Sequence, residues 1–596
     1  MKLNPIQQKA VNYSGGPLLI VAGAGSGKTK TLTARLINFI NKGVSAKSII
    51  AITFTNKAAS EMRRRVLSMA NSNKVYHYEH SLFIGTFHSF GARILKTHAR
   101  ELNRTSGFSI FDADDSMSLM KKIAKERNIN KERYKLPILS AQISKIKAML
   151  YSPEELLDEC ELEFYNDYEK GLINNNAFDF DDLIEKVVVL FKNKPEILKK
   201  YQNQFRYILV DEYQDVNTAQ YELIKSLAEK HKNISVVGDD AQAIYGWRYA
   251  DFRNFLNFEN DWEKAEIIKL EQNYRSSGNI ISAASNVIKN NKLQKSKNLW
   301  TENSGGELLK IISAETSEGE ANFIAETIKN FPSDFKNAGA TAILYRTNAQ
   351  SRALEQSLIQ YQIPYKIFGG VKFYERKEIK DVIAALKIAF NPKDTISADR
   401  LKKTFLKAVR EKLIHKMIES GKKMNIVELI NLFINESNYF DYLRQKFTNV
   451  NERIENINEF ISFASEFPNL EELLEKVSLL QSTDIPKNEM GAENNENPIN
   501  LMTIHMAKGL EFDNVFLAGA NEGLLPHQRS YGNLEELEEE RRLMYVAMTR
   551  AKNNLRISFC HIPSRFLYEI QPELTEFINL NGEGGELPNE DEIYIR

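Results

Sequence analysis

The chain has 596 residues, of which 42% are hydrophobic, and it carries 79 Lys and Arg against 79 Asp and Glu. This length exceeds what one hydrophobic core usually supports, so we expect roughly three to five domains or subdomains. Because the net charge is zero, the whole molecule has no basic field to hold a polyanion, and any nucleic-acid site must be local.

The cysteine content and the N-terminus indicate the compartment. Cys160 and Cys560 lie far apart and have no CxxC partner, which argues against a disulfide framework or a cysteine metal site. The N-terminal segment MKLNPIQQKAVN lacks the apolar core of a signal peptide, and no segment approaches the roughly 18 apolar residues of a membrane span. The sequence predicts a soluble, cytoplasmic protein with no membrane association.

Short apolar runs that end in polar clusters recur along the first half of the chain. They cover residues 18–21, 49–54, 207–210 and 234–237. Such runs are typical of a buried parallel sheet, whose ligands bind at the carboxyl ends of the strands. The charged stretch 93–177 separates the second run from the third and predicts a helical insertion.

A second set of strand-like runs follows and predicts a second α/β domain. This domain is interrupted by a Lys- and Glu-rich helical stretch from about Pro392 to Asp484, and the polar run from Lys487 to Asn497 is typical of a linker. The predicted strands are 308–312, 342–345, 501–504, 515–518 and 555–559.

The run AGAGSGKT lies directly after the first apolar run and before a helical pattern, which is the context of a nucleotide phosphate loop. Glycines let backbone N–H groups close around phosphate oxygens at the positive end of the helix. Lys28 would neutralise the β- and γ-phosphates, and Thr29 would bind Mg²⁺. The motif predicts ATP or GTP binding by Ala22, Gly23, Ala24, Gly25, Ser26, Gly27, Lys28 and Thr29.

Two acidic residues, Asp211 and Glu212, follow the third apolar run. Beside a phosphate loop, Asp211 would hold Mg²⁺ through its water shell, and Glu212 would orient and deprotonate the attacking water. The alternative is a solvated acidic turn.

The fourth apolar run continues into GDDAQAIYGWR. Gln242 could contact a γ-phosphate, while Tyr245, Trp247 and Arg248 follow a few residues later. This layout could couple hydrolysis to a ligand that stacks on aromatic rings, such as single-stranded nucleic acid. Taken alone, Tyr245 or Trp247 is better explained as an ordinary core residue.

A series of motifs in fixed order covers nearly the whole chain and resembles the UvrD, Rep and PcrA family of superfamily-one DNA helicases. The motifs are LNPIQQ, AGAGSGKT, TFTNKAA, GTFH, DEYQD, GDDAQAIYGWR, LEQNYRS, TIHMAKGLEF and EERRLMYVAMTRAK.

The resemblance implies an α/β fold of two RecA-like P-loop NTPase domains with parallel sheets, each carrying a mainly helical insertion. The expected parts are 1–92 and 178–268 for the first domain, 93–177 for its insertion, 269–391 and 498–575 for the second domain, 392–497 for a shortened second insertion, and 576–596 for an acidic tail.

The resemblance also implies roles for individual residues in ATP hydrolysis. Lys28, Thr29, Asp211, Glu212 and Gln242 match the hydrolytic set. The remaining positions are one glutamine that reads adenine and two arginines that reach the γ-phosphate, at Gln7, Arg275 and Arg550. Each arginine could instead form a surface salt bridge.

For DNA, the resemblance implies a track of stacking and contact residues, movement from 3′ to 5′, and single-stranded DNA and its junctions with duplex as partners. Stacking on aromatic rings is independent of base sequence. The implied residues are Phe54, Tyr245, Trp247 and Tyr274 for stacking and His88, Arg248 and His505 for other contacts. Aromatic residues alone do not distinguish DNA from RNA.

The chain departs from the family in its second insertion. Residues 399–409 lack the Gly-x-Gly turn with which relatives grip duplex DNA, and only a short acidic stretch follows Leu567. We therefore expect no C-terminal partner-binding module and a weak hold on duplex. Two alternatives stay open, a translocase that strips proteins from single strands and a regulatory module with an inactive ATPase. Against the second argue the intact Lys28, Glu212, Arg275 and Arg550.

Overall fold

The computed structural model describes residues 2–69, 82–129, 134–331, 341–368, 372–392, 394–421, 423–474, 477, 498–580, 582 and 587–588. The chain divides into two compact units, residues 1–281 with 288–304, and residues 282–287 with 305–596. The segment 269–281, which we assigned to the second domain, belongs to the first unit. The reason is that β8 pairs with β1 and the following residues pack on the phosphate loop.

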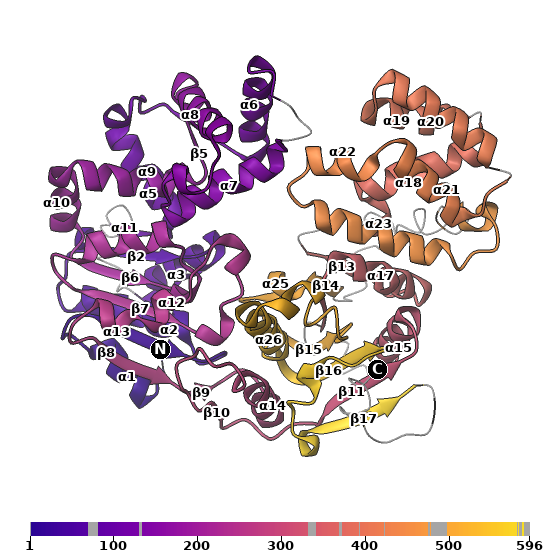
Figure 1. The fold of residues 1–596 in the computed structure, drawn as a ribbon. Coiled ribbons are helices and arrows are strands. Elements are labelled where there is room, and N and C mark those ends of the chain that lie inside the picture. The colour runs from indigo at the N-terminus through magenta and orange to yellow at the C-terminus, as the bar shows by residue number, and fades with distance from the viewer. Residues whose placement is uncertain are drawn as a thin grey trace. The chain divides into compact units, whose positions relative to one another are not determined.

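A six-stranded parallel sheet in the order β3-β2-β6-β7-β1-β8 forms the centre of the first unit (Figure 1). Four of its strands match predicted runs, while β3 and β8 were not predicted. The strands are β1 Leu18–Ala22, β2 Ile49–Thr53, β3 Phe83–Thr86, β6 Tyr207–Val210, β7 Ile234–Gly238 and β8 Glu266–Leu270; β9 Gln272–Asn273 pairs separately with β10 Trp300–Thr301.

Alternate residues of this sheet enter two different hydrophobic cores. Leu18 and Ile20 pack with helices α2 and α3, whereas Leu19 and Val21 pack with α5, α9 and α11. A sheet covered on both faces needs continuous apolar strands, which explains the apolar runs in the sequence. The covering helices are α1 Pro5–Asn12, α2 Lys28–Asn41, α3 Asn56–Met69, α5 Phe87–His98, α9 Asp182–Asn193, α10 Pro195–Gln204 and α11 Thr218–Ala228, with the short α12 Arg253–Leu256 and α13 Phe258–Asp261.

The first insertion has a hydrophobic core of its own, formed between Met117 and Ala177. It contains helices and a two-stranded parallel sheet that the sequence did not predict. Its predicted start at residue 93 lies inside α5, whose apolar side chains belong to the core of the main sheet. The elements are β4 Ser109–Phe111, α6 Ala113–Glu126, α7 Leu136–Met149, α8 Glu159–Asn174 and β5 Ala177–Asp179.

The second unit contains a seven-stranded parallel sheet in the order β13-β14-β12-β15-β16-β11-β17. The strands are β11 Leu309–Ala314, β12 Thr341–Tyr345, β13 Tyr365–Ile367, β14 Ile499–Thr503, β15 Phe512–Leu517, β16 Ala551–Cys560 and β17 Thr575–Asn579. β17 lies where we expected the acidic tail to begin, because its residues pair with β11. The associated helices are α15 Ser317–Lys329, α17 Ser351–Gln360, α25 Ile504–Ala507 and α26 Leu534–Met548, and α14 Gly278–Ile288 joins the two units along the chain.

The second insertion is a helical subdomain with its own core (Figure 1). This core begins at Phe373, well before the predicted boundary at 392, because α18 packs against the inserted helices. The helices are α18 Lys377–Phe390, α19 Thr395–Thr404, α20 Lys407–Ser420, α21 Ile426–Glu436, α22 Tyr439–Lys446 and α23 Val450–Ala464. The predicted linker 487–497 lies outside the described residues.

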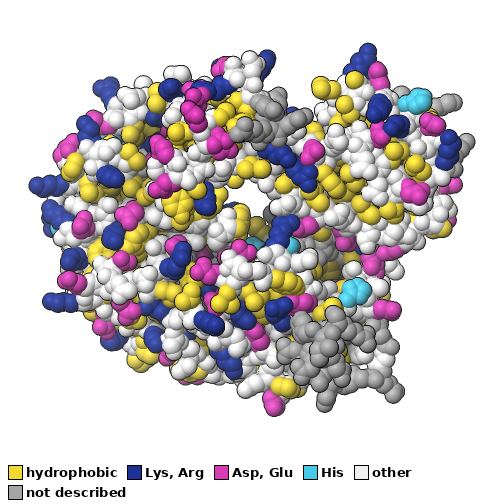
Figure 2. Space-filling model, in the orientation of Figure 1, with side chains coloured by type: hydrophobic (Ala, Val, Ile, Leu, Met, Phe, Trp, Pro, Cys, Tyr) yellow, Lys and Arg dark blue, Asp and Glu magenta, His cyan; other side chains and the backbone are white. Residues whose placement is uncertain are grey.

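Acidic and basic side chains alternate over the face shown in Figure 2, in keeping with the balanced composition. Within the described ranges, no helix is both long enough and apolar enough to cross a bilayer.

Candidate nucleotide site and nucleic-acid interface

The phosphate loop leaves β1 at Ala22 and enters α2 at Lys28. Gly25 and Gly27 have φ angles of 66° and 81°, in the left-handed region that favours glycine. A Cβ atom on Gly25 would lie 2.6 Å from Nδ2 of Asn273, so the loop also needs glycine for close packing.

The residues after β8 hold this loop in place. Asn273 Nδ2 donates a hydrogen bond to the carbonyl of Ala24 at 2.6 Å, and the backbone N–H of Tyr274 donates to the carbonyl of Gly25 at 3.0 Å. Within the loop, Ser26 Oγ donates to the carbonyl of Gly23 at 2.8 Å. With these carbonyls engaged, the loop is preorganised before a phosphate binds.

The predicted Mg²⁺ residues lie in contact. Thr29 Oγ1 donates to Asp211 Oδ2 at 2.9 Å. Burial, followed by the charge of Glu212, raises the pKa of Asp211 to about 7, and Lys28 opposes this rise. A hydroxyl and a carboxylate at this distance are the oxygen ligands that Mg²⁺ prefers beside nucleotide phosphates.

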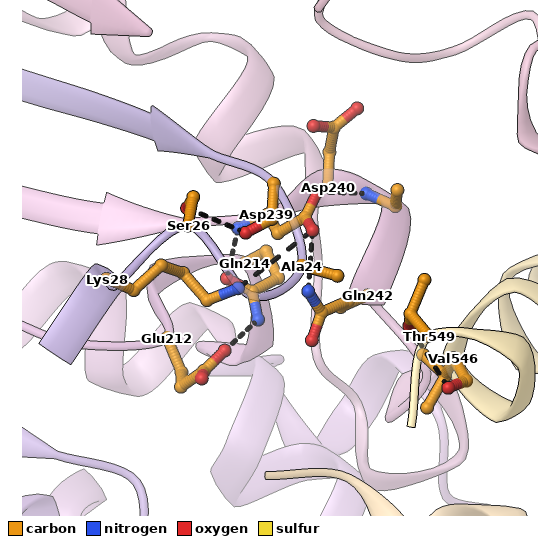
Figure 3. A network of polar contacts seen from close by, with 12 residues as sticks. Ala24, Ser26, Lys28, Glu212, Gln214, Asp239, Asp240, Gln242, Val546 and Thr549 are labelled. Atoms are coloured by element: carbon orange, nitrogen blue, oxygen red, sulfur yellow. Dashed lines mark hydrogen bonds and ion pairs between the residues drawn. The ribbon is translucent and has the colours of Figure 1, made fainter. Parts of the chain in front are cut away.

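A hydrogen-bond chain joins the two acidic motifs (Figure 3). Gln214 Nε2 donates to Glu212 Oε2 at 2.6 Å, and Gln214 Oε1 accepts from the backbone N–H of Asp239 at 3.0 Å. Asp239 Oδ2 in turn accepts from Gln242 Nε2 at 2.6 Å and lies 3.9 Å from Lys28 Nζ. Gln214 and Asp239 lie in the DEYQD and GDDAQAIYGWR motifs, but these motifs alone indicate no role for either residue.

Tyr274, predicted to stack on DNA bases, contacts residues at the start of the chain. Its hydroxyl accepts from Asn4 Nδ2 at 2.7 Å and donates to Gln272 Oε1 at 2.7 Å. Gln7, in the same N-terminal segment, is buried and its Nε2 donates to the carbonyl of Ser26 at 3.0 Å. Tyr274 therefore lies beside the N-terminal segment and the phosphate loop, and its role in base stacking on DNA stays a prediction.

The two predicted arginines have different surroundings, each within its own unit. Arg275 is half-buried beside the phosphate loop, where its Cβ would lie 2.9 Å from a Cβ on Gly25. Arg550 is buried at the end of α26, where it donates to the carbonyls of Val546 and Leu510 at 3.0 and 3.1 Å. Arg550 therefore also has a structural role that its motif does not indicate.

Three of the predicted aromatic residues form one cluster with Arg248. The rings of Phe54 and Tyr245 stack with centroids 5.3 Å apart, and Trp247 lies edge-on to Tyr245 at 6.4 Å. The guanidinium of Arg248 lies 4.5 Å from the centroid of Trp247. Because Trp247 is 59% exposed, it is not an ordinary core residue and its ring faces solvent.

His88 stacks on Phe180, an exposed aromatic residue that the sequence reasoning missed, with centroids 3.9 Å apart. Burial lowers the pKa of His88 to about 4, so the ring is neutral near pH 7. In the second unit, His505 is half-buried in the short helix α25, whose N-terminus is capped by Thr503.

The α19–α20 turn lies within residues 399–409, where the sequence has no Gly-x-Gly, and has Phe405 and Leu406 between the helices. Leu406 is 82% exposed, and Lys402, Lys403 and Lys407 are exposed near it in the sequence. We expected this segment to bind duplex DNA weakly, because it lacks the glycines, but the turn presents basic side chains.

Comparison with known proteins agrees with this geometry. Residues 3–263 match the UvrD/REP helicase N-terminal domain, and residues 268–451 and 435–562 match the UvrD-like helicase C-terminal domain. The chain is 39% identical to the ATP-dependent DNA helicase PcrA of Bacillus subtilis, over 97% of this chain and 87% of that protein. It is 40% identical to a probable DNA helicase II homologue of Rickettsia felis, over 96% of each chain. The chain therefore belongs to the UvrD/REP helicase family and is an ATP-dependent DNA helicase.

Proposed function

We propose that this helicase uses ATP with Mg²⁺ to move from 3′ to 5′ along single-stranded DNA, and that it acts at single-strand/duplex junctions in the cytoplasm during DNA repair or replication restart. The polarity and the pathway rest on the resemblance of its motifs to UvrD, Rep and PcrA. The proposed chemistry of ATP hydrolysis rests on the positions of the site residues.

Five side chains of the first unit would carry out hydrolysis. Thr29 and Asp211 hold Mg²⁺, which neutralises charge on the β- and γ-phosphates. Lys28 binds the same phosphates, and Glu212 accepts a proton from the attacking water. Gln242 senses the γ-phosphate from the next loop.

The base and the γ-phosphate have their own proposed contacts. Gln7 binds the edge of the adenine, because its buried side chain lies beside the phosphate loop and donates to the carbonyl of Ser26. Arg275 and Arg550 stabilise charge on the γ-phosphate in the transition state, an effect of about 10³ to 10⁵ in rate in nucleotide hydrolases where it is known.

The observation that carries the proposal is the loop from Asp239 to Arg248. One end is bonded to the hydrolytic network through Gln242, and the other presents the exposed ring of Trp247 beside Tyr245. A base stacked on Trp247 can therefore alter the position of Gln242, which lies five residues earlier in the chain. The other proposed DNA contacts are Phe54, His88, Arg248, Tyr274 and His505.

Strand displacement on matched duplexes with a 3′ or a 5′ single-stranded tail tests the proposal. We expect ATP-dependent separation of the 3′-tailed duplex alone. Separation of the 5′-tailed duplex would overturn the polarity. Equal stimulation of the ATPase by RNA and DNA strands would broaden the substrate class.

A second candidate, a translocase that strips proteins from single strands and unwinds poorly, is favoured by the α19–α20 turn. Without glycines, this turn offers no close backbone approach to duplex phosphates, and its contact would depend on flexible lysines. Fast displacement of streptavidin from a biotinylated strand, together with weak unwinding by the monomer, would support this candidate.

A further inference from the structure

Residues 295–299, which we term the strap, fold back onto the nucleotide site of the first unit. The backbone N–H of Lys295 donates to Asp240 Oδ2 at 2.9 Å, and Asn298 N–H donates to Glu271 Oε1 at 2.8 Å. Leu299 packs on the phosphate loop so closely that a Cβ on Gly23 would lie 2.2 Å from its Cδ2. The strap carries Lys297 into the site.

Lys297 forms two short ion pairs in a buried position. Its Nζ lies 2.8 Å from Asp239 Oδ1 and 2.7 Å from Asp240 Oδ1, and its side chain is only 6% exposed. The Asp239 side chain is fully buried. A buried carboxylate needs a cation and hydrogen-bond donors, since its desolvation costs several kcal/mol.

Two cations share Asp239. Lys297 faces Oδ1, while Lys28 Nζ lies 3.9 Å from Oδ2, the oxygen that also accepts from Gln242. Burial alone would raise the pKa of Asp239, but the charges of Lys297 and then Lys28 hold it below its ordinary value. Of these two lysines, Lys28 is the one that lies in the phosphate loop and would bind the nucleotide phosphates.

We propose that Lys297 is a positioning residue for ATP hydrolysis, which neutralises Asp239 so that Lys28 can move to the phosphates while Asp239 continues to hold Gln242. The inference rests on the proposed role of Lys28. When Lys28 leaves Asp239 for the nucleotide, Lys297 is the cation within 3 Å of the buried carboxylate.

Without Lys297, nucleotide binding would meet an electrostatic cost. Lys28 would then be the lysine that balances the charge of the buried Asp239 carboxylate. Its movement to the phosphates would leave this negative charge without either lysine beside it. Nucleotide affinity should fall, although no atom of Lys297 need contact the nucleotide. The loss should depend on the negative charge of Asp239.

The test measures the Kd of a fluorescent ADP and of a non-hydrolysable ATP analogue on the full chain. We expect Lys297→Met to raise both Kd values by about tenfold and Lys297→Arg to restore most of the affinity. Lys295→Met is the matched control, because the Lys295 ammonium pairs with Glu259 instead, at 2.6 Å. Thermal melting and circular dichroism check that each variant is folded.

The double variant Lys297→Met/Asp239→Asn separates this role from simple packing. Because the neutral amide no longer needs a cation, it should bind nucleotide more tightly than Lys297→Met alone. An unchanged Kd for Lys297→Met, or an additive loss in the double variant, would overturn the inference. If wild-type protein bound no nucleotide, the proposed function itself would fail.

Discussion

Gln214 links the two halves of the proposed hydrolytic site, donating to Glu212 Oε2 at 2.6 Å while accepting from the backbone N–H of Asp239 at 3.0 Å. Both contacts are buried or half-buried, so the amide fixes the direction of the Glu212 carboxylate relative to the loop that holds Gln242. A neighbour that orients a ligand of a metal site is commonly worth 10- to 100-fold in activity, and we expect an effect of similar size for Glu212 beside the proposed Mg²⁺ site.

We therefore predict that Gln214→Met lowers the kcat for ATP about tenfold or more with a small change in KM. The substitution keeps the volume and removes these two bonds, together with the bond that Gln214 Nε2 donates to Asp215 Oδ2 at 3.1 Å. Steady-state ATPase assays with saturating single-stranded DNA measure both kcat and KM. Gln220→Met is the control, because Gln220 caps α11 through Asn217 and has no bond to the site. A wild-type kcat would show that Glu212 needs no orienting partner.

Lys28→Ala should abolish ATP hydrolysis and leave single-strand affinity within a few-fold of wild type. The lysine belongs to the phosphate loop, whereas the proposed DNA contacts lie on other loops. ATPase assays and fluorescence anisotropy with a labelled oligonucleotide measure the two effects. Near wild-type turnover would remove the basis of the proposed site.

The arginine variants should differ in stability as well as in rate. Arg275→Ala and Arg550→Ala should each lower kcat by about 10² or more, because their proposed contacts strengthen as charge develops in the transition state. Arg550→Ala should also lower the melting temperature, because the carbonyls of Val546 and Leu510 lose buried donors, at about 1–3 kcal/mol for each. Loss of nucleotide affinity with an intact kcat would make either arginine a ground-state binder.

Trp247→Ala should weaken single-strand affinity by about 1–3 kcal/mol and depress the DNA-stimulated ATPase more than the basal rate. The melting temperature should stay unchanged, because the Trp247 ring is 59% exposed and contributes little to the core. Trp300→Ala is a matched control, since Trp300 is 47% exposed on β10 and lies outside the aromatic cluster. Unchanged DNA affinity with a lower melting temperature would make Trp247 a structural residue.

His88 should make the stability of the first unit depend on pH. Its pKa is about 4 in the folded protein and about 6.5 when exposed in an unfolded chain, so the unfolded state binds more protons between these values. The stabilisation is complete above about pH 6.5 and is lost as the pH falls toward 4, by about 2 kcal/mol between pH 7.5 and pH 5.

Thermal melting at these two pH values compares wild type with His88→Gln. The melting temperature of the wild type should fall more on acidification, because the glutamine does not titrate. Equal falls would mean that His88 is not buried in its neutral form.

The sequence by itself determined the family and the parallel sheets, and it predicted most of the proposed nucleotide site. These features depend on short local patterns: apolar runs long enough for strands covered on both faces, and glycines at left-handed positions such as Gly25 and Gly27. Residues that act through one loop or strand end, such as Lys28 and Glu212, can be identified because their neighbours in the chain supply their context.

Tertiary structure decided what depends on segments distant in the sequence. Tyr274 belongs with Asn4, Lys297 with Asp239, and Phe180 with His88, although these partners lie 270, 58 and 92 residues apart along the chain. The second insertion begins earlier than the sequence predicted for the same reason, because α18 packs in one hydrophobic core with helices that follow it in the chain. No local pattern specifies such contacts, since they form only when the packed sheets and helices bring separate segments together.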